Sequence, residues 1–421
     1  MSNCNNISSL YQINRRQLLG MPFALAIAGR AKAADKPRVA TIVTEYRDRS
    51  HADVIVGRLL EGYEYYGTFR KPRVNVVSMY IDQVPDNDMS YDLAAKHGFK
   101  IFPSVREALL MGGKNLAVDG VVLIGEHGSY HSNIKGQKLY PRWYLYKQII
   151  DAFRRAGSVA PVYVDKHFSV DWDEAKWMYE QSREMNFPFM GGSSLPLAWR
   201  IPELELELET PVEKAVAVSF GGKEAYGFHG LETLQCMVER RRGGETGVAG
   251  VRCLDGDEVW KWTDANPWAD RLMKQCLLRC TESKKSSPRV NVKAPAVFVI
   301  DYRNGLQAAM YVLNGQGLDS WAFAAEIRGK KEPVSTQFRL QRYTPHNHFS
   351  PLVNYIEEMI LTGRTSYPVE RTLLTTGTLA ALIDSSFYKR RIETPHLDIV
   401  YRAQKESLYN RGPVPAPKAN G

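Results

Sequence analysis

A lysine follows a short apolar strand in the first half of the chain. The strand is predicted over residues 161–164, and Lys166 comes two residues later. Doubly wound sheets bind ligands outside the carboxyl ends of their strands, so this position favours a site. A lysine there can polarise a hydroxyl group and help to take its proton, provided that burial or a neighbouring cation lowers its pKa. The other interpretation is a solvated lysine at a strand end.

Polar residues also follow the apolar strand predicted over residues 118–124. Glycines flank an acid and a histidine in the segment Gly125–His131, which is typical of a loop that lets a ligand approach closely. Four side chains in this part of the chain could be imagined as metal ligands: Glu126, His127, His131 and His167. No pair of them has a known ligand spacing on one helix face, so we predict no metal site.

Arg142 and Trp143 begin a helix predicted over residues 142–156 and are candidates for contacts to a carbohydrate. Aromatic faces stack on the C–H surfaces of sugars, and arginine donates to hydroxyl groups. His167, directly after Lys166, is a third candidate for a substrate contact. Most aromatic residues of this kind belong to a core or an oligomer interface, and for Trp143 we prefer that structural interpretation.

Short β-type runs alternate with helical patterns in the first half, which is typical of βαβ units and a parallel sheet. Strands are predicted over residues 39–43, 74–81, 118–124, 161–164 and 187–190. Ser50 and Asp53 have the spacing that begins a helix, and apolar residues at helical spacing follow them. We therefore predict an α/β fold that begins with a Rossmann-type doubly wound domain over residues 34–193.

After residue 193 the pattern changes to alternating strands with helices between them. Strands are predicted over residues 204–208, 216–220, 297–302 and 306–313. Asn304 and Gly305 predict a hairpin turn between the last two. The sequence therefore predicts an α+β domain with a largely antiparallel open sheet over residues 194–411, and a disordered tail or surface strap over residues 412–421.

Several segments occur in a recognisable order along the chain. They are Val118–Ile124 with His131 seven residues later, Asp165–Lys166 after a strand, and Thr362–Arg364 leading to Tyr367–Arg371. In this order they resemble the Gfo/Idh/MocA oxidoreductases over residues 38–386. The resemblance implies a dinucleotide-binding domain and a second domain whose open sheet builds homo-oligomers. It also implies hydride transfer to or from a hydroxyl or keto group of a sugar or cyclitol.

The resemblance implies catalytic roles for Lys166 and His229. The family lysine contacts cofactor and substrate and assists proton transfer, and the family histidine is the general base. Imidazole suits that role because it titrates near neutral pH. This chain has Ala225 where the family has an aspartate, so Glu224 or Glu232 would have to stand in. The other interpretation of His229 is a helix residue that packs against the sheet.

The loop after the first strand contains no glycine, where the family has Gly-x-Gly-x-x-Gly. The loop residues that could contact a dinucleotide are Thr44, Glu45, Tyr46, Arg47 and Ser50. A helix N-terminus near Ser50 and the charge of Arg47 favour phosphate binding. Glu45 and Tyr46, in contrast, can fill the space that glycines leave open.

Three further residues complete the expected cofactor site. Asp82 ends the second strand, where a carboxylate binds the ribose hydroxyls of NAD and repels the 2′-phosphate of NADP. The family places nicotinamide contacts in the segment that holds Glu126 and His131. The resemblance thus implies tightly bound NAD, with NADP less favoured. The alternative is a carbohydrate-binding or structural paralogue that has lost the dinucleotide site.

Residues 1–33 have the three parts of a signal peptide. The pair Arg15–Arg16 precedes an apolar run over residues 21–29 that is too short to span a bilayer, and Ala31–Ala33 forms a small-x-small cleavage site. The arginine pair fits the twin-arginine class, and a Sec signal or a retained anchor are the alternatives. We therefore expect the twin-arginine machinery as a partner, a periplasmic or extracellular location, and no stable membrane association after cleavage.

Composition excludes several other classes of protein. The 421 residues are 44% hydrophobic and 24% charged, which argues against disorder, collagen-like repeats and a coiled coil. Residues 1–33 hold four basic residues and no acid, and removing these four from the net charge of +9 leaves +5, so we predict no nucleic-acid partner. The four cysteines of the remaining chain lack a CxxC pair. Cys276 and Cys280 stand four residues apart in a helical stretch, where a bridge or a metal pair is conceivable, and we favour two semi-buried thiols.

Overall fold

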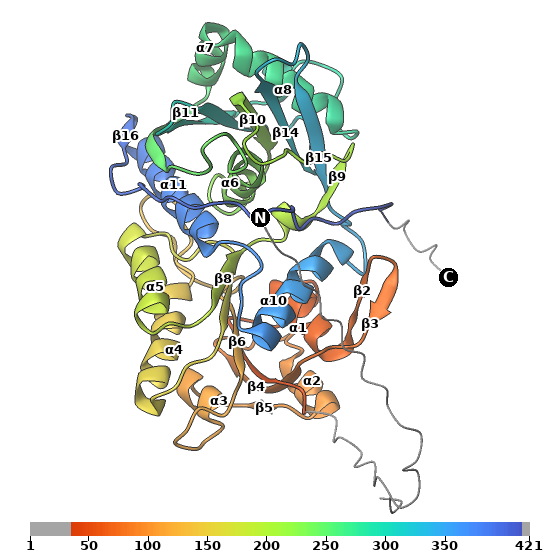
Figure 1. The fold of residues 1–421 in the computed structure, drawn as a ribbon, viewed down its shortest axis with the longest axis vertical. Helices are drawn as coiled ribbons and strands as arrows, with labels where there is room; N and C mark the ends of the chain where they lie inside the picture. The colour runs from red at the N-terminus through yellow and green to blue at the C-terminus, as the bar shows by residue number, and fades with distance from the viewer. Residues whose placement is uncertain (1–34, 415–421) are drawn as a thin grey trace, which may run out of the picture. The chain divides into compact units, whose positions relative to one another are not determined.

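The computed structural model describes residues 35–414, and the chain from Lys36 onward forms one compact unit. Two large β-sheets, each flanked by helices, make up most of this unit (Figure 1). The predicted signal segment lies outside the described residues, as do residues 415–421 of the predicted tail. Within residues 35–414, no helix is long and apolar enough to cross a membrane.

The first sheet consists of six parallel strands in the order β5-β4-β1-β6-β7-β8. The strands are β1 (Arg38–Val43), β4 (Asn75–Ile81), β5 (Lys100–Ile101), β6 (Gly120–Ile124), β7 (Val162–Asp165) and β8 (Phe189–Gly192). Counted along the chain, this is the order 3-2-1-4-5-6 of the Rossmann fold. The predicted doubly wound sheet is therefore confirmed.

Helices cover both faces of the first sheet, because successive side chains of its buried strands point to opposite faces. On β1, Val39 and Val43 contact one apolar layer, and Ala40 and Ile42 contact the other. The first layer contains α1 (His51–Glu61), α2 (Ser90–His97), α10 (Ser350–Thr362) and the hairpin of β2 (Tyr63–Tyr65) and β3 (Thr68–Arg70). The second contains α3 (Val105–Leu110), α4 (Arg142–Ala156) and α5 (Trp172–Glu184).

One helix of the first layer comes from the far end of the chain. Leu352, Ile356 and Met359 of α10 pack in the same core as Val39, and Figure 1 shows blue α10 beside red-orange α1. The predicted domains, residues 34–193 and 194–411, each contain one of the two large sheets, but α10 returns from the second segment to the first sheet.

The second sheet has eight strands in the order β16-β11-β12-β13-β10-β14-β15-β9. They are β9 (Trp199–Ile201), β10 (Val212–Ser219), β11 (Val248–Asp255), β12 (Ala296–Tyr302), β13 (Gln307–Val312), β14 (Trp321–Ile327), β15 (Val334–Arg339) and β16 (Ile392–Glu393). All neighbouring pairs are antiparallel except β10 and β13, which are parallel. The hairpin turn at Asn304–Gly305 is confirmed, with Gly305 at φ 89°.

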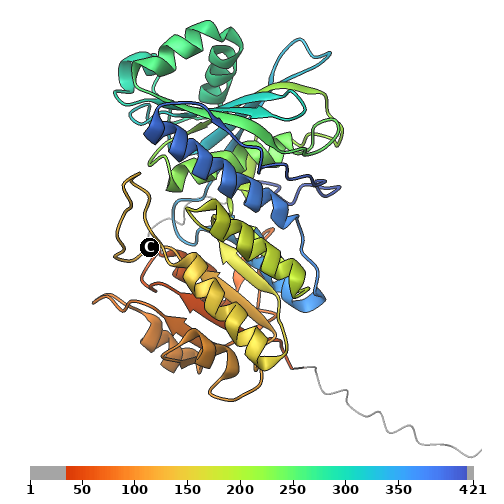
Figure 2. The ribbon, with the colours of Figure 1, turned by 90° about the vertical axis from the view of Figure 1, so that its left-hand side faces the viewer.

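Helices also cover both faces of the second sheet (Figure 2). One face packs against α6 (Ala225–Val238) and α11 (Val369–Tyr388), and the other against α7 (Asp257–Ala265) and α8 (Pro267–Arg279). The short helices are α9 (Pro288–Asn291) and the 3₁₀ turns η1 (Leu195–Leu197) and η2 (Asn347–Phe349). The family resemblance implies that this sheet builds homo-oligomers. In this chain α7 and α8 cover one face of it, and the homo-oligomer stays a prediction.

The strand predicted over residues 204–208 is wrong, because this segment has no regular structure. Arginine side chains take carbonyl groups that a neighbouring strand would otherwise pair with. Arg200 donates to the carbonyl of Leu204 (2.9 Å), and Arg240 donates to that of Leu206. The alternation of leucines and glutamates was therefore misleading. Only Leu206 of the three leucines is buried, and it lies on an irregular segment.

Candidate active site

Lys166 lies directly beyond β7, at the carboxyl edge of the first sheet. Its backbone is left-handed, with φ 63°, and its N–H donates to the carbonyl of Gly192 at the end of β8 (3.0 Å). Non-glycine residues rarely adopt this conformation, and such strain is concentrated at functional sites. Lys166 is only 5% exposed, which rules out the interpretation as a solvated lysine.

A buried ion cluster surrounds the lysine. Lys166 Nζ lies 2.8 Å from Glu126 Oε1, and Arg142 Nη1 lies 3.2 Å from Glu126 Oε2. Burial alone would raise the pKa of Glu126, but the two cations outweigh it and hold that pKa well below its ordinary value. The carboxylate is therefore ionised at neutral pH, and it fixes the ammonium group at the sheet edge.

His167 connects this cluster to the second sheet's helix α6. Its Nε2 lies 2.7 Å from Arg142 Nη2 and 2.9 Å from Glu224 Oε1, but one ring nitrogen cannot serve a donor and an acceptor together. Burial, followed by the charge of Arg142, lowers the pKa of His167. We therefore assign a neutral ring whose Nε2 accepts from Arg142.

His229 lies on the first half of α6 and is 8% exposed. Its Nδ1 is buried without a hydrogen-bond partner among residues 35–414, and its ring contacts Trp321 at 5.5 Å between centroids. Burial, followed by the charge of Lys166, lowers the pKa of His229 well below its usual value. Neither Glu224 nor Glu232 binds the ring, so the loss of the family aspartate is not compensated.

Glu232 instead accepts the backbone N–H of Ser193 at 2.7 Å, and burial raises its pKa to about 7. The folded state binds this proton more tightly than the unfolded state, so stability falls as the pH rises from about 4.5 to above 7. We expect Glu232→Gln to raise the free energy of unfolding by about 3 kcal/mol at pH 8 and by much less at pH 5. Urea unfolding at both pH values measures this. An equal gain in unfolding free energy at pH 5 and pH 8 would contradict this prediction. The same gain at pH 8 for Glu332→Gln, at an exposed position, would also contradict it.

The glycine-free loop between β1 and α1 is packed into the protein. Tyr46 is fully buried, and Glu45 is 7% exposed and paired with Arg47. Thr44 Oγ1 donates to the carbonyl of Glu126 (2.7 Å), and Ser50 caps α1 by accepting from the N–H of Asp53, as predicted. The bulky loop residues therefore fill the space that glycines leave open in a phosphate-binding loop.

Two predicted site residues lie away from the cluster. His131 is exposed, and its carbonyl accepts from the N–H of Leu139 within the long loop after β6. The Trp143 ring packs edge-on against Trp177 of α5 at 6.1 Å between centroids. The fold thus brings together five of the predicted site residues, but neither His131 nor Trp143. The five are Lys166, Glu126, Arg142, His167 and His229.

Sequence reasoning missed a second pair at the same edge. His51 Nδ1 lies 2.7 Å from Asp165 Oδ2, and the His51 and His127 rings are 5.4 Å apart. The only available signal was position along the chain. His51 begins α1 and Asp165 ends β7, and both of these ends lie at the same edge of the sheet.

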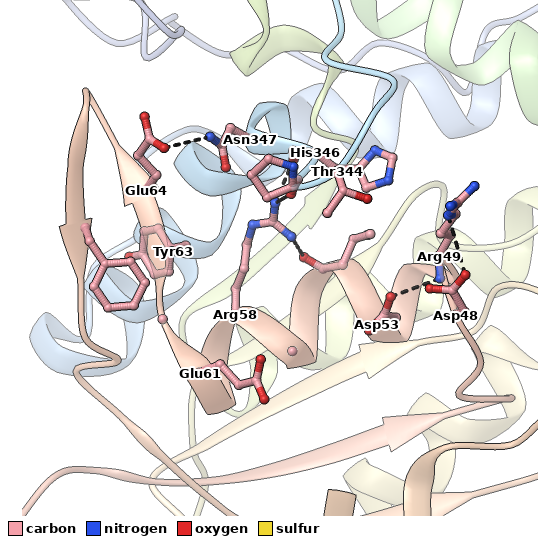
Figure 3. A pocket seen from close by; sticks show the side chains of 15 residues that line it. Asp48, Arg49, Asp53, Arg58, Glu61, Tyr63, Glu64, Thr344, His346 and Asn347 are labelled. Carbon is pink, nitrogen blue, oxygen red and sulfur yellow. Dashed lines mark hydrogen bonds and ion pairs between the residues drawn. The ribbon is translucent and has the colours of Figure 1, made fainter. Parts of the chain in front are cut away.

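A cavity of about 390 Å³ lies against α1, the β2–β3 hairpin and residues 344–347 (Figure 3). Within it, the Arg58 guanidinium donates to the carbonyls of Val54, Pro345 and His346. None of the predicted site residues lines this cavity, so we do not place the chemistry there.

Residues 35–414 contain no group of three or more His, Cys, Asp or Glu residues placed to hold a metal ion. The four cysteines in this range are free and buried, which confirms that Cys276 and Cys280 are unbridged thiols.

Comparison with solved structures reveals similar folds at low identity. GenD2 from gentamicin A biosynthesis, in complex with NAD, is 14% identical, with a TM-score of 0.54 over 86% of this chain and 97% of GenD2. Scyllo-inositol dehydrogenase from Lactobacillus casei is 9% identical, with a TM-score of 0.52 over 85% of this chain and 98% of the dehydrogenase. An oxidoreductase from Agrobacterium radiobacter, in complex with NAD+, L-tartaric acid and magnesium, is 12% identical, with a TM-score of 0.51 over 85% of this chain and 98% of the oxidoreductase. No protein-family model and no curated protein matches the sequence.

The chain has the Gfo/Idh/MocA-type fold. In such a doubly wound sheet a dinucleotide crosses the carboxyl end of the first strand. In this chain, protein side chains bridge that place from β4 to the loop after β6. Gln83 Oε1 accepts from Ser129 N (2.8 Å), Gln83 Nε2 donates to Ser129 O (3.1 Å), and Tyr130 donates to Asp82 (2.6 Å).

The bridge takes up the groups that a dinucleotide would need. Asp82, the expected ribose ligand, accepts from the hydroxyls of both Tyr80 and Tyr130. Glu45 places a carboxylate in the loop where phosphates would lie. The residues at this crevice, as arranged here, therefore do not fit a nicotinamide dinucleotide.

Proposed function

We propose that the protein is an enzyme that transfers protons at a hydroxyl- or keto-bearing carbon of a sugar or cyclitol. The observation that carries the proposal is the buried Lys166–Glu126 pair beside a neutral His229 with an unpartnered Nδ1. A fixed ammonium group and a free imidazole lone pair at one sheet edge are the parts of a general acid–base site.

Each group has a defined task. Lys166 has three N–H donors and uses one of them on Glu126, so two can bind a substrate oxygen and stabilise negative charge on it. The neutral His229 ring can accept the proton of a substrate hydroxyl. Arg142 holds Glu126 from the other side and so keeps the lysine in place.

The substrate class is supported by the polar character of the site and by the similar structures, one of which is named as a scyllo-inositol dehydrogenase. A panel of sugars, cyclitols and their keto derivatives, followed by NMR and mass spectrometry, tests the proposal. We expect conversion or solvent-proton exchange of at least one member; a panel left unchanged would sink the proposal.

A second candidate is an NAD-dependent oxidoreductase, favoured by the fold and by Asp82 at the end of β4. Because the crevice is bridged, we expect the purified protein to release no nicotinamide dinucleotide on denaturation. We also expect 1 mM NAD not to raise its melting temperature, whereas a site with Kd near 10 µM would add about 2.7 kcal/mol of stability. Stoichiometric NAD would instead establish the second candidate, and NADP is disfavoured by the Asp82 carboxylate.

A variant that opens the bridge serves as the matched control. Gln83→Ala combined with Tyr130→Phe removes the three bridging bonds and frees Asp82 from one tyrosine. If the bridge excludes the dinucleotide, this variant gains NAD-dependent stabilisation that the native protein lacks.

Export through the twin-arginine route, with a periplasmic or extracellular location, is part of the same proposal and is supported by the sequence of residues 1–33. A fusion of these residues to a folded reporter tests it: export that requires both Arg15 and Arg16 is expected.

A further inference from the structure

His51 and Asp165 form an imidazole–carboxylate pair that the acid–base site described above does not use. His51 is the first residue of α1, and its Nδ1 lies 2.7 Å from Oδ2 of Asp165, the last residue of β7. The Asp165 side chain is 0% exposed, and its other oxygen accepts only a long bond from the Tyr163 hydroxyl (3.4 Å). A carboxylate accepts hydrogen bonds, so the proton lies on Nδ1 and the lone pair on Nε2.

The His51 ring is held on three sides. Asp165 binds Nδ1, the His127 ring lies 5.4 Å away, and Phe349 meets the ring edge-on at 5.5 Å. The side chain is 17% exposed, and Nε2 makes no hydrogen bond within residues 35–414. A fixed imidazole with one free nitrogen can therefore meet a ligand.

The pair lies in the same electrostatic neighbourhood as the lysine. Asp165 directly precedes Lys166 in the chain. Burial lowers the pKa of His127 to about 4. His51 lies close enough that protonating its ring would lower the pKa values of both His127 and His229 further. The His51 ring, which Asp165 binds at the N-terminus of α1, therefore lies at the same edge of the first sheet as Lys166.

We propose that His51, oriented by Asp165, is a catalytic base that removes a proton from the carbon next to a substrate keto group. The inference rests on the proposed function and adds a reaction class to it: keto–enol proton transfer on a keto sugar or keto cyclitol. Asp165 is a positioning residue, because it acts through the ring.

The step needs no hydride carrier. The C–H bond breaks, its proton moves to His51 Nε2, and its electron pair forms the C=C bond of an enolate. The keto oxygen takes the negative charge beside the Lys166 ammonium group. Return of a proton from Nε2 to the same face of the carbon restores the ketone, so no electrons enter or leave, and in D₂O the product is the ketone with that hydrogen exchanged for deuterium.

The test uses 2-keto-myo-inositol and ketohexoses in D₂O with the full protein. We expect the NMR signal of the C–H next to the keto group to disappear with the native enzyme. His51→Ala is expected to slow this exchange by about 100- to 10,000-fold, the usual range for loss of a general base. Added imidazole should restore part of the rate in His51→Ala, which a merely structural role would not allow.

Matched variants separate the possible failures. His97, whose Nε2 lies 3.4 Å from Glu61, is a histidine–carboxylate pair outside the site, so His97→Ala should exchange at the native rate. Asp165→Asn should slow exchange without abolishing binding of the ketone, measured by calorimetry. If the native protein exchanges the C–H proton, and Lys166→Met abolishes this exchange while His51→Ala leaves it unchanged, the inference is overturned and the proposed function is kept. Conversion of the sugar panel without any C–H exchange also overturns the inference alone, whereas no conversion and no exchange overturns both.

Discussion

Lys166→Met should lower turnover by about 100- to 10,000-fold, the range typical of a positioned acid–base group. Methionine keeps the apolar stem but removes the ammonium group that binds Glu126 at 2.8 Å and that, in the proposed function, binds the substrate oxygen. The expected loss is in kcat rather than in KM, because the interaction with developing charge is made in the transition state. Steady-state kinetics on the substrate found in the panel measures it.

Stability has to be separated from catalysis in this variant, since removing one partner leaves Glu126 buried with Arg142 alone. The double variant Lys166→Met with Glu126→Gln removes the uncompensated charge and should regain the melting temperature without regaining turnover. Lys147→Met, on the exposed surface of α4, is the matched control. Full activity in Lys166→Met would remove the lysine from the mechanism.

Arg371→Met should lower the free energy of unfolding by about 3–5 kcal/mol, the cost of leaving a buried charge without its partner. Arg371 of α11 makes two bonds to Glu239 just beyond α6, at 2.8 and 2.6 Å, and the two side chains are 3% and 1% exposed. Tyr401 also donates to Glu239. Urea unfolding at pH 7, followed by circular dichroism, measures the change.

The control is an exposed pair of the same type. Arg402 and Glu209 lie 2.9 Å apart but are 69% and 56% exposed, so Arg402→Met should cost less than about 1 kcal/mol. Adding Glu239→Leu to Arg371→Met should recover most of the lost stability, because a hydrophobic pair often replaces a buried ion pair without cost. Equal losses in the two single variants would show that burial is not the cause.

Local patterns were enough to predict most strands of the first sheet and the position of Lys166. Ser50 and Asp53 marked the start of α1, and Asn304–Gly305 marked the hairpin, because caps and turns depend on residues close in sequence. Lys166 could be placed because parallel strands end at a common edge.

Long-range pairing could not be predicted in the same way. His51 and Asp165 are 114 residues apart, and nothing in either neighbourhood specifies the other. The Gln83–Ser129 bridge depends on a loop after β6 folding back across β1, which single-sequence patterns do not encode. The motif that ends in Arg371 carried a family resemblance, yet in this fold its arginine contributes a buried ion pair.

The position of α10 constrains the order in which the protein can fold. Leu352, Ile356 and Met359 complete the apolar layer that β1 and α1 begin near residue 39, yet they leave the ribosome some 300 residues later. Until then the layer over β1 has an uncovered apolar face that a holding chaperone could occupy. On the proposed twin-arginine route, which carries folded proteins, almost the whole chain would therefore have to be synthesised before export could begin.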